Sequence, residues 1–531
     1  MATMRMVLML WVASLSASVV AQDRSEEKLG QVSFPTSCAP EVRESFDRAV
    51  ALLHSFWYEA AEAAFLEIAQ RDPECAMAYW GVAMTAVHPL WPDTPDYDKG
   101  RQAAAKAAAL GGGNALEAGY IDAVMQFFVG TEPPDYPARK RAFERAMGTL
   151  HERFPDDAEV TIFYALALTA TAPPEDETYV NQKQAAALLD GLAPLLPEHP
   201  GILHYTIHAY DSPEMAEHAL QVARRYTEVA SSVPHGLHMS SHIFTRLGLW
   251  QESVATNGSA SHAGHGFASE LGLPGAWDEE LHAMEYWMYA LLQLADDDEA
   301  KNVLVELQTH PTGSPMTMKS AHPFAGIPAR YVLERRQWKA AATLDAVPGD
   351  LPWDQFPFAY AMTVYARAIG AARTQELADA RSHLEQIESL RDRTNDPYWA
   401  RQIEVLRLEA SAWLAHAEGN SADALRWLES AVELEESMEK HAVTPGPIVP
   451  AREQLGELLV AMGRPAEGLT EYEAALAVAP NRFNGLYGAG VAARDMGDMA
   501  KAREYFTALV AMCDEAGGSR PELDTARSFI E

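Results

Sequence analysis

The chain has 531 residues, of which 48% are hydrophobic and 22% are charged, and its formal net charge at pH 7 is −34. Such an acidic surface repels phosphates, so the composition argues against nucleic acid as a partner. The length exceeds that of one compact core and suits either several domains or a repeat array that grows by stacking.

The first residues have the features of a secretory signal. Arg5 supplies a positive charge, residues 6–20 are largely apolar, and a stretch of small residues ends at Ala21. The alternative is a membrane anchor, but the apolar run is shorter than the roughly 20 residues that a membrane span needs. We expect residues 1–21 to be removed and the mature chain, without a membrane span, to be a periplasmic or secreted bacterial protein.

The next segment has the pattern of a helical hairpin, with a cysteine at each end. These residues are Cys38 and Cys75. Export to an oxidising compartment permits a disulfide between them, whereas two buried thiols would be the alternative in a cytosolic protein. Given the signal sequence we favour the disulfide. Cys513 has no obvious partner.

Histidine is concentrated in one region, because seven of the 18 histidines lie within residues 199–242. Two motifs account for the excess, and a third motif with similar spacing follows them. At about 100° per residue on a helix, the members of each motif fall within roughly 60° of one another. The motifs are His204-His208-Asp211, His235-His238-His242 and Asp278-His282-Glu285.

Imidazole and carboxylate groups at this density are typical of divalent-metal ligands and of groups that transfer protons. If the three motifs lie on successive inner helices of a hairpin array, their polar stripes line one concave groove. We therefore expect all nine residues to form a groove site for a ligand. In a metal site, Asp211 or Glu285 would orient a ligand or act as general base. The metal ligands would be His204, His208, His238, His242 and His282.

A structural hydrogen-bond network is the competing interpretation of the same residues. A buried histidine often satisfies a neighbouring carbonyl or carboxylate group. Asp211, followed by Ser212 and Pro213, also fits the N-cap of the next helix. The sequence contains no HExxH, paired CxxC, phosphate-loop or GxSxG motif, so the common hydrolase and nucleotidase classes lack their signatures. The pattern predicts where a functional site lies, but it does not indicate which reaction the site would carry out.

The C-terminal part repeats with a period of 34 residues, and the first hairpin ends in a related alanine, aromatic and proline pattern. The pattern resembles the tetratricopeptide repeat, most clearly over residues 42–90 and 448–512. It implies an all-α fold, an α-solenoid superhelix of tetratricopeptide-like hairpins. Strands are not expected, because no segment shows sustained alternation. The positions concerned are Ala61, Phe65, Pro73, Gly456, Gly463, Tyr472, Gly490, Gly497 and Phe506.

Proline- and glycine-rich stretches divide this array into four expected segments after the signal. Residues 22–200 would form N-terminal hairpins and residues 201–345 the histidine-rich hairpins. Further hairpins would occupy residues 346–440, and a regular repeat pair would occupy residues 441–531.

Several phrases also look like those of a bacterial group of exported tetratricopeptide-repeat proteins. The resemblance covers roughly the first two thirds of the chain and implies that the histidine motifs belong to the group's design. It supplies no activity. The phrases lie at residues 34–38, 75–81, 204–211, 234–250, 281–286 and 327–331.

Two hypotheses of different class follow. The leading one is an exported scaffold whose concave groove binds a peptide, a protein or a small ligand, because a curved helical array offers such a surface. The second is a metal-dependent enzyme that uses the histidine motifs to hold a divalent transition metal. Metal analysis of the purified protein, with and without a chelator, discriminates between them.

Overall fold

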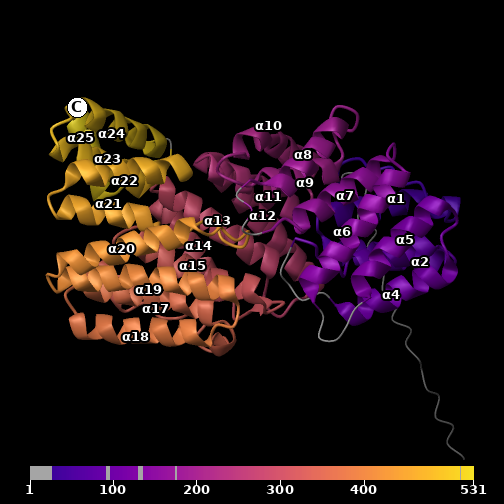
Figure 1. The fold of residues 1–531 in the computed structure, drawn as a ribbon, viewed down its shortest axis with the longest axis horizontal. Coiled ribbons are helices and arrows are strands. Elements are labelled where there is room, and N and C mark those ends of the chain that lie inside the picture. The colour runs from indigo at the N-terminus through magenta and orange to yellow at the C-terminus, as the bar shows by residue number, and fades with distance from the viewer. Residues whose placement is uncertain (1–26, 91–95, 130–134, 174–175, 177, 515) are drawn as a thin grey trace, which may run out of the picture.

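The computed structural model describes residues 27–90, 96–129, 135–173, 176, 178–514 and 516–531. These residues form 25 α-helices, and consecutive helices pack against each other as hairpins (Figure 1). The all-α fold and the solenoid-like array of hairpins are therefore confirmed. The expected signal peptide, residues 1–21, lies outside the described residues, and the four expected segments stay a prediction.

The N-terminal lobe, coloured indigo to magenta in Figure 1, has one apolar core that extends from Leu29 to Phe244. Its helices are η2 (Pro40–Val42), α1 (Arg43–His54), α2 (Tyr58–Arg71), α3 (Ala76–Met84), α4 (Tyr97–Leu110), α5 (Ala115–Phe128), α6 (Tyr136–Arg153), α7 (Ala158–Ala170), α8 (Val180–Leu192), α9 (Pro200–Tyr210), η3 (Ala216–Ala219) and α10 (Leu220–Val229).

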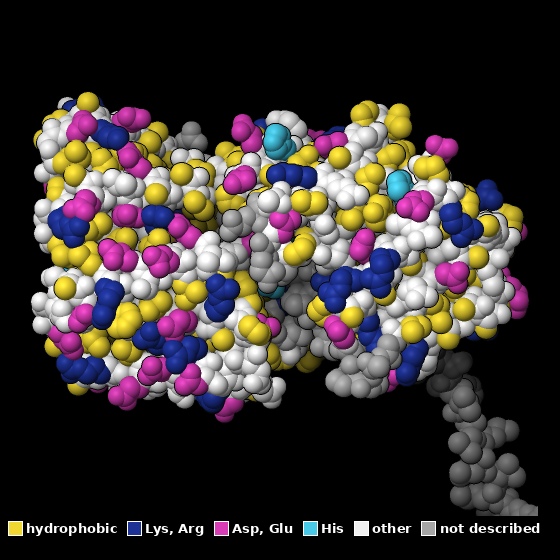
Figure 2. Space-filling view, viewed as in Figure 1, with side chains coloured by type: hydrophobic (Ala, Val, Ile, Leu, Met, Phe, Trp, Pro, Cys, Tyr) yellow, Lys and Arg dark blue, Asp and Glu magenta, His cyan; other side chains and the backbone are white. Residues whose placement is uncertain are grey.

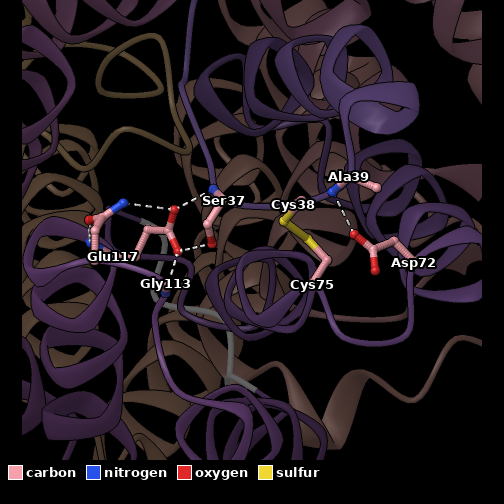
Figure 3. Close-up of a disulfide and its surroundings, with 8 residues drawn as sticks. Ser37, Cys38, Ala39, Asp72, Cys75, Gly113 and Glu117 are labelled. Carbon is pink, nitrogen blue, oxygen red and sulfur yellow. Dashed lines mark hydrogen bonds between the residues drawn. A yellow bond between two sulfur atoms is a disulfide. The ribbon is translucent and has the colours of Figure 1, made fainter.

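A disulfide joins Cys38 to Cys75 at the start of this lobe, which is the pairing that the sequence favours (Figure 3). Ser37, which precedes Cys38, is fixed by two hydrogen bonds. Its backbone N–H and its hydroxyl donate to the carboxylate of Glu117 at 2.5 and 2.6 Å. The bridge and these hydrogen bonds fix the extended N-terminal segment to the first helices. Cys513 is a buried free thiol.

The central region continues the hairpins and adds one element that the sequence did not predict. Two strands of two residues each pair in parallel, so the expectation of no strands is wrong at this point. The pairing ties the segment before α13 to the segment after α14. The elements are α11 (Pro234–Arg246), α12 (Trp250–Leu271), β1 (Ala276–Trp277), α13 (Asp278–Gln293), α14 (Asp297–Thr309), β2 (Gly313–Ser314), α15 (Met318–Leu333) and α16 (Trp338–Ala342).

Local sequence explains where the histidine-bearing helices begin. Helices α9 and α11 each begin with a proline, Pro200 and Pro234, at a position where the missing N–H group has no helical partner to lose. Elsewhere, Asp157 caps α7 by accepting the N–H of Val160.

The C-terminal lobe, coloured orange to yellow in Figure 1, completes the array. Its helices are η4 (Trp353–Gln355), α17 (Pro357–Arg373), α18 (Leu377–Arg393), α19 (Pro397–Ala417), α20 (Ser421–Glu436), α21 (Ala451–Ala461), α22 (Pro465–Val478), α23 (Phe483–Asp495), α24 (Met499–Asp514) and α25 (Pro521–Ile530).

The array folds back on itself, whereas each repeat of a simple solenoid contacts only its neighbours. The indole N–H of Trp250 donates to the carbonyl of Asn481 at 2.7 Å. At Gly248, whose φ is +65°, an added Cβ would lie 2.2 Å from the carbonyl oxygen of Pro480. The start of α12 and the C-terminal helices are therefore packed backbone to backbone, which a side chain at Gly248 would prevent.

The surface itself is mixed. On the face shown in Figure 2, acidic and basic side chains are interspersed over both lobes, and few histidines are visible. Most of the histidines singled out from the sequence are buried.

Candidate metal centre

Three alternate helices bring six histidines together. His204 and His208 lie on α9, three more lie on α11, and His282 lies on α13. The three helices alternate along the chain with α10 and α12 between them, and their place as inner helices of hairpins stays a prediction. Ring centroids are 4.8 Å apart for His204 and His208, and 4.3 Å apart for His238 and His282.

The six imidazoles form two adjacent groups, which we call the α9 group (His204, His208 and His235) and the α11 group (His238, His242 and His282). Within each group, one ring nitrogen of every histidine lies within 4.8 Å of the others. The two groups meet where the rings of His208 and His242 are 6.4 Å apart. The arrangement thus offers two neighbouring three-imidazole sites.

Hydrogen bonds at Nδ1 fix the orientation of four of these rings. In each case the partner is an oxygen that only accepts, so the proton lies on Nδ1 and the lone pair on Nε2. The pairs are His204 with the carbonyl of His54 at 2.7 Å, His235 with Glu279 Oε2 at 2.9 Å, His238 with Asn257 Oδ1 at 2.7 Å and His242 with Asp211 Oδ2 at 2.8 Å.

The amide of Asn257 is itself oriented. Its Nδ2 donates to the backbone carbonyl of Ser253 at 2.8 Å, and its Oδ1 accepts the hydroxyl of Ser241 at 3.1 Å. The oxygen must therefore face His238, because the nitrogen is held by Ser253. The hydrogen bonds of Asn257 thus assign the proton of His238 to Nδ1.

As a result, two lone pairs face each other inside the α11 group. The Nε2 atoms of His238 and His242 are 3.1 Å apart, and neither carries a proton when both rings are neutral. His235 Nε2 is also buried, and it has no hydrogen-bond partner among the described residues. A tetrahedral ion with metal–nitrogen bonds of 2.0–2.1 Å separates its ligands by about 3.3 Å. The spacing therefore fits two ligands of one transition metal.

Protonation of the imidazoles in the two groups is disfavoured. Burial lowers the pKa of His242 to about 4, despite its hydrogen bond to Asp211. Burial and neighbouring imidazoles hold the pKa of His204, His208, His238 and His282 well below the usual value. Neutral imidazole is the form that ligates metals, so these rings are ready to do so at neutral pH.

Charged residues surround the cluster and position its anchors. Arg246 Nε donates to Asp211 Oδ1 at 2.8 Å, and Lys440 Nζ lies 3.7 Å from Asp211 Oδ2. Burial alone would raise the pKa of Asp211, but the charges of Lys440 and Arg246 hold it well below its usual range. On the other side, Lys319 pairs with Glu279. Both anchoring carboxylates therefore stay ionised.

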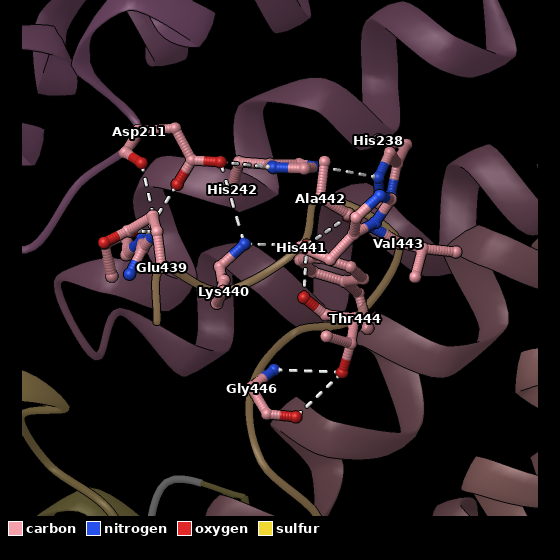
Figure 4. A network of polar contacts seen from close by, with 12 residues as sticks. Asp211, His238, His242, Glu439, Lys440, His441, Ala442, Val443, Thr444 and Gly446 are labelled. Atoms are coloured by element: carbon pink, nitrogen blue, oxygen red, sulfur yellow. Dashed lines mark hydrogen bonds and ion pairs between the residues drawn. The ribbon is translucent and has the colours of Figure 1, made fainter. Parts of the chain in front are cut away.

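A distant loop covers the cluster, and we call residues 439–446 the covering loop (Figure 4). Arg246 donates to Glu439 at 2.6 Å, and the hydroxyl of Tyr286 donates to the carbonyl groups of Ala442 and Thr444 at 3.1 and 3.0 Å. Tyr286 also stacks on His242, with ring centroids 4.9 Å apart.

The predicted groove site stays a prediction, and the structure shows these residues enclosed. Phe56 packs against His204, and Tyr286 packs against His242 while it donates to the covering loop. His208 and Asp211 are partly buried, and the other seven candidates are 0–6% exposed, namely His204, His235, His238, His242, Asp278, His282 and Glu285.

A small cavity remains beside the two groups. Four of the histidines face it, together with apolar side chains from the N-terminal lobe and from the covering loop. Its lining is Phe56, Tyr58, Leu90, His208, His235, Met239, His242, Glu279, His282 and Ala442.

Two of the predicted carboxylates make other contacts. Glu285 faces α15, where its Oε2 accepts Nδ1 of His322 at 2.7 Å and its Oε1 lies 3.6 Å from Nε of Arg330. Asp278 lies 3.4 Å from Lys319 Nζ. The expected orienting role thus falls to Asp211, whereas Glu285 anchors a histidine outside the cluster.

Sequence reasoning missed several residues of the site. Arg246 and Glu279 adjoin the motifs, Arg246 one turn after His242 and Glu279 next to Asp278, so local spacing could have found them. Asn257 and Lys440 come from the next helix and from a remote loop, where no local pattern marks them.

Comparisons with known proteins add little. No protein-family model matches the chain, and no curated protein matches it. The similar solved structures include the following two. One is the Cut9–Hcn1 hetero-tetramer of APC/C, with 10% identity, coverage of 91% of this chain and 90% of that chain, and a TM-score of 0.30. The other is the TPR domain of P58(IPK), with 12% identity, coverage of 92% and 98%, and a TM-score of 0.20. With scores this low, neither says what this chain binds.

Among the described residues, none of the helices combines the length and the apolar character that a membrane crossing requires.

Proposed function

We propose that this protein binds two transition-metal ions, one in the α9 group and one in the α11 group, and that it is a metal-dependent enzyme. The observation that carries the proposal is the pair of deprotonated Nε2 atoms of His238 and His242, 3.1 Å apart, on rings whose Nδ1 protons are held elsewhere. Oxygen acceptors that hold the Nδ1 proton of a histidine are typical partners of metal-bound histidine.

The ligand set narrows the choice of ion. Imidazole suits zinc, copper, nickel and iron, whereas magnesium and calcium prefer oxygen ligands. Each group supplies three imidazoles, which leaves a coordination position for water or substrate, as in catalytic zinc sites. The adjoining cavity, lined in part by Phe56, Tyr58, Leu90 and Met239, has a volume of about 20 Å³, which suits a water molecule beside the imidazoles.

Export forms part of the proposal. The disulfide between Cys38 and Cys75 suits an oxidising compartment, in agreement with the predicted signal at residues 1–21. We therefore propose that the mature protein acts in the periplasm or outside the cell.

Metal content tests the proposal directly. The exported protein is stripped with chelator, reloaded with Zn²⁺ or Cu²⁺, desalted and analysed for bound metal and for its circular dichroism. We expect His238→Ala and His242→Ala each to lose the ion of the α11 group while the helical signal stays nearly constant. The exposed His218 lies outside both groups, so His218→Ala is the matched control.

A structural network gives the opposite result. In that case His242→Ala would lower the melting temperature and leave the metal content equal to that of the control, and the proposal would fail.

Protein binding is the second candidate function. Stacked hairpins present extended outer surfaces, and Val180 and Leu195 expose apolar side chains at the two ends of the α8 region, 58% and 74% exposed. Because the covering loop fills the histidine region, a partner would dock on such an outer surface. A partner that binds equally well to metal-free and metal-loaded protein would favour this function.

A further inference from the structure

A second set of side chains that could hold a metal ion lies around Glu280 of α13, away from the histidine cluster. His265 of α12, Glu280 of α13, Glu306 of α14 and His310, which follows α14, each bring one ligand atom within 4.8 Å of the others. Glu280 and His282 are two residues apart, so their side chains leave α13 about 160° from each other. The set is therefore distinct from both histidine groups.

Glu280 is the centre of this set. Its side chain is 0% exposed, and its Oε1 lies 3.0 Å from Nδ1 of His265 and 3.4 Å from Nε2 of His310. Its Oε2 is buried and has no hydrogen-bond partner among the described residues. In the described part of the chain, its ion-pair partners are these two histidines, without a lysine or arginine. A buried carboxylate in this state is destabilising unless a cation neutralises it.

Two features of the backbone fix the geometry. A Cβ on Gly264 would lie 3.1 Å from Cβ of Glu280, so the glycine lets α12 approach α13 directly beside His265. The pairing of β1 with β2 holds the segment that follows His310 against the start of α13. The unexpected strand pair thus positions one of the four side chains.

We propose that His265, Glu280, Glu306 and His310 bind one divalent ion of the zinc class, which clamps α12, α13 and α14 together. Two imidazoles and two carboxylates form a neutralising tetrahedral set for zinc, and all four ligand positions come from the protein, as in structural sites. The side chain of His265 is 56% exposed, so the ion enters from solvent, toward a chain of net charge −34.

The test counts bound Zn²⁺ in the full mature protein after stripping, reloading and desalting. We expect His265→Ala/His310→Ala to bind one ion fewer than the wild type, and to lose the rise in melting temperature that Zn²⁺ gives at this clamp. His262→Ala, one turn before His265 on the same helix and also exposed, is the matched control and should bind as the wild type does. Glu280→Gln serves as a second variant, and the exposed His265→Ala single variant avoids any dependence on core folding.

The proposal of the clamp and the proposal of the histidine cluster can be tested independently. His238→Ala/His242→Ala should lose the ion of the α11 group and keep the clamp ion, whereas His265→Ala/His310→Ala should lose the clamp ion and keep both ions of the cluster. The clamp proposal is overturned if His265→Ala/His310→Ala binds as many ions as His262→Ala. It is also overturned if Zn²⁺ no longer stabilises His238→Ala/His242→Ala.

Discussion

The same residue types give different chemistry at two places in this chain. At the first, His54 Nε2 and His199 Nε2 both contact the carboxylate of Glu159 at 2.9 Å, and His54 Nδ1 contacts the hydroxyl of Tyr205 at 2.9 Å. Burial opposes ionisation of Glu159, but the two histidines lower its pKa to about 2. Each of these contacts joins a donor to an acceptor. In the α11 group, by contrast, acceptor faces acceptor.

The anchor of His242 gives a test at this scale. Asp211→Asn removes the negative charge that holds the Nδ1 proton of His242 and that balances Arg246. Loss of such an orienting partner weakens metal binding by about 10–100-fold. A Zn²⁺ titration monitored by a competing chelator measures this change.

The exposed Asp190, which accepts the hydroxyl of Tyr210, provides the control through Asp190→Asn. Equal affinities of the Asp211→Asn and Asp190→Asn variants would show that Asp211 has no part in metal binding.

At the scale of elements, α13 explains both a success and a failure of the sequence analysis. Helical phase correctly groups the side chains of Asp278, His282 and Glu285 on one narrow sector. Helical phase does not predict which neighbouring helix each side chain contacts. Because α13 packs between α11 and α15, His282 meets α11 whereas Glu285 meets α15. The direction of each side chain depends on packing that one helix does not encode.

The first hairpin gives a prediction for an element. The bridge between Cys38 and Cys75 closes a loop with a sequence separation of 37. On the chain-entropy model a loop of this size stabilises the folded state by about 3–4 kcal/mol. Cys38→Ser/Cys75→Ser should therefore unfold its N-terminal lobe at lower denaturant concentration than the wild type.

Reductant supplies the control for this comparison. It should destabilise the wild type and leave the double variant unchanged. Identical unfolding curves for the oxidised wild type and the double variant would contradict the predicted stabilisation.

At the scale of the whole molecule, buried neutral histidines make stability depend on pH. Burial lowers the pKa of His88 and His242 to about 4 and that of His441 to about 3, from 6.5. Between these values and 6.5 the unfolded chain binds more protons than the folded chain, so acid favours unfolding. The stability is complete above about pH 6.5 and is lost as pH falls toward about 4.

Each of these histidines contributes about 1.4 kcal/mol per pH unit in that window. Denaturant unfolding of chelator-treated protein at pH about 7.5 and about 5.5 measures the effect. A free energy of unfolding that stays constant between the two would contradict the burial of neutral imidazoles.

The array and the approximate place of the site could be predicted from the sequence, because both depend on local periodicity. The spacing of His204 and His208, or of His238 and His242, needs one helix only. The position of the covering loop could not be predicted, because no sequence pattern near Lys440 indicates that it contacts Asp211. The loop helps to bury the site, which local periodicity could not predict.

Several contacts around the site join residues that are far apart in the sequence, which affects the order in which the chain folds. Arg246 and Glu439 are 193 residues apart, and Trp250 and Asn481 are 231 residues apart. Contacts of high sequence separation form slowly, and a nascent chain folds from its N-terminus. The histidine helices therefore emerge well before the covering loop exists. Until residues 439–446 are made, the contacts of Arg246 with Glu439 and of Tyr286 with Ala442 cannot form, so the imidazoles are less enclosed than in the complete fold.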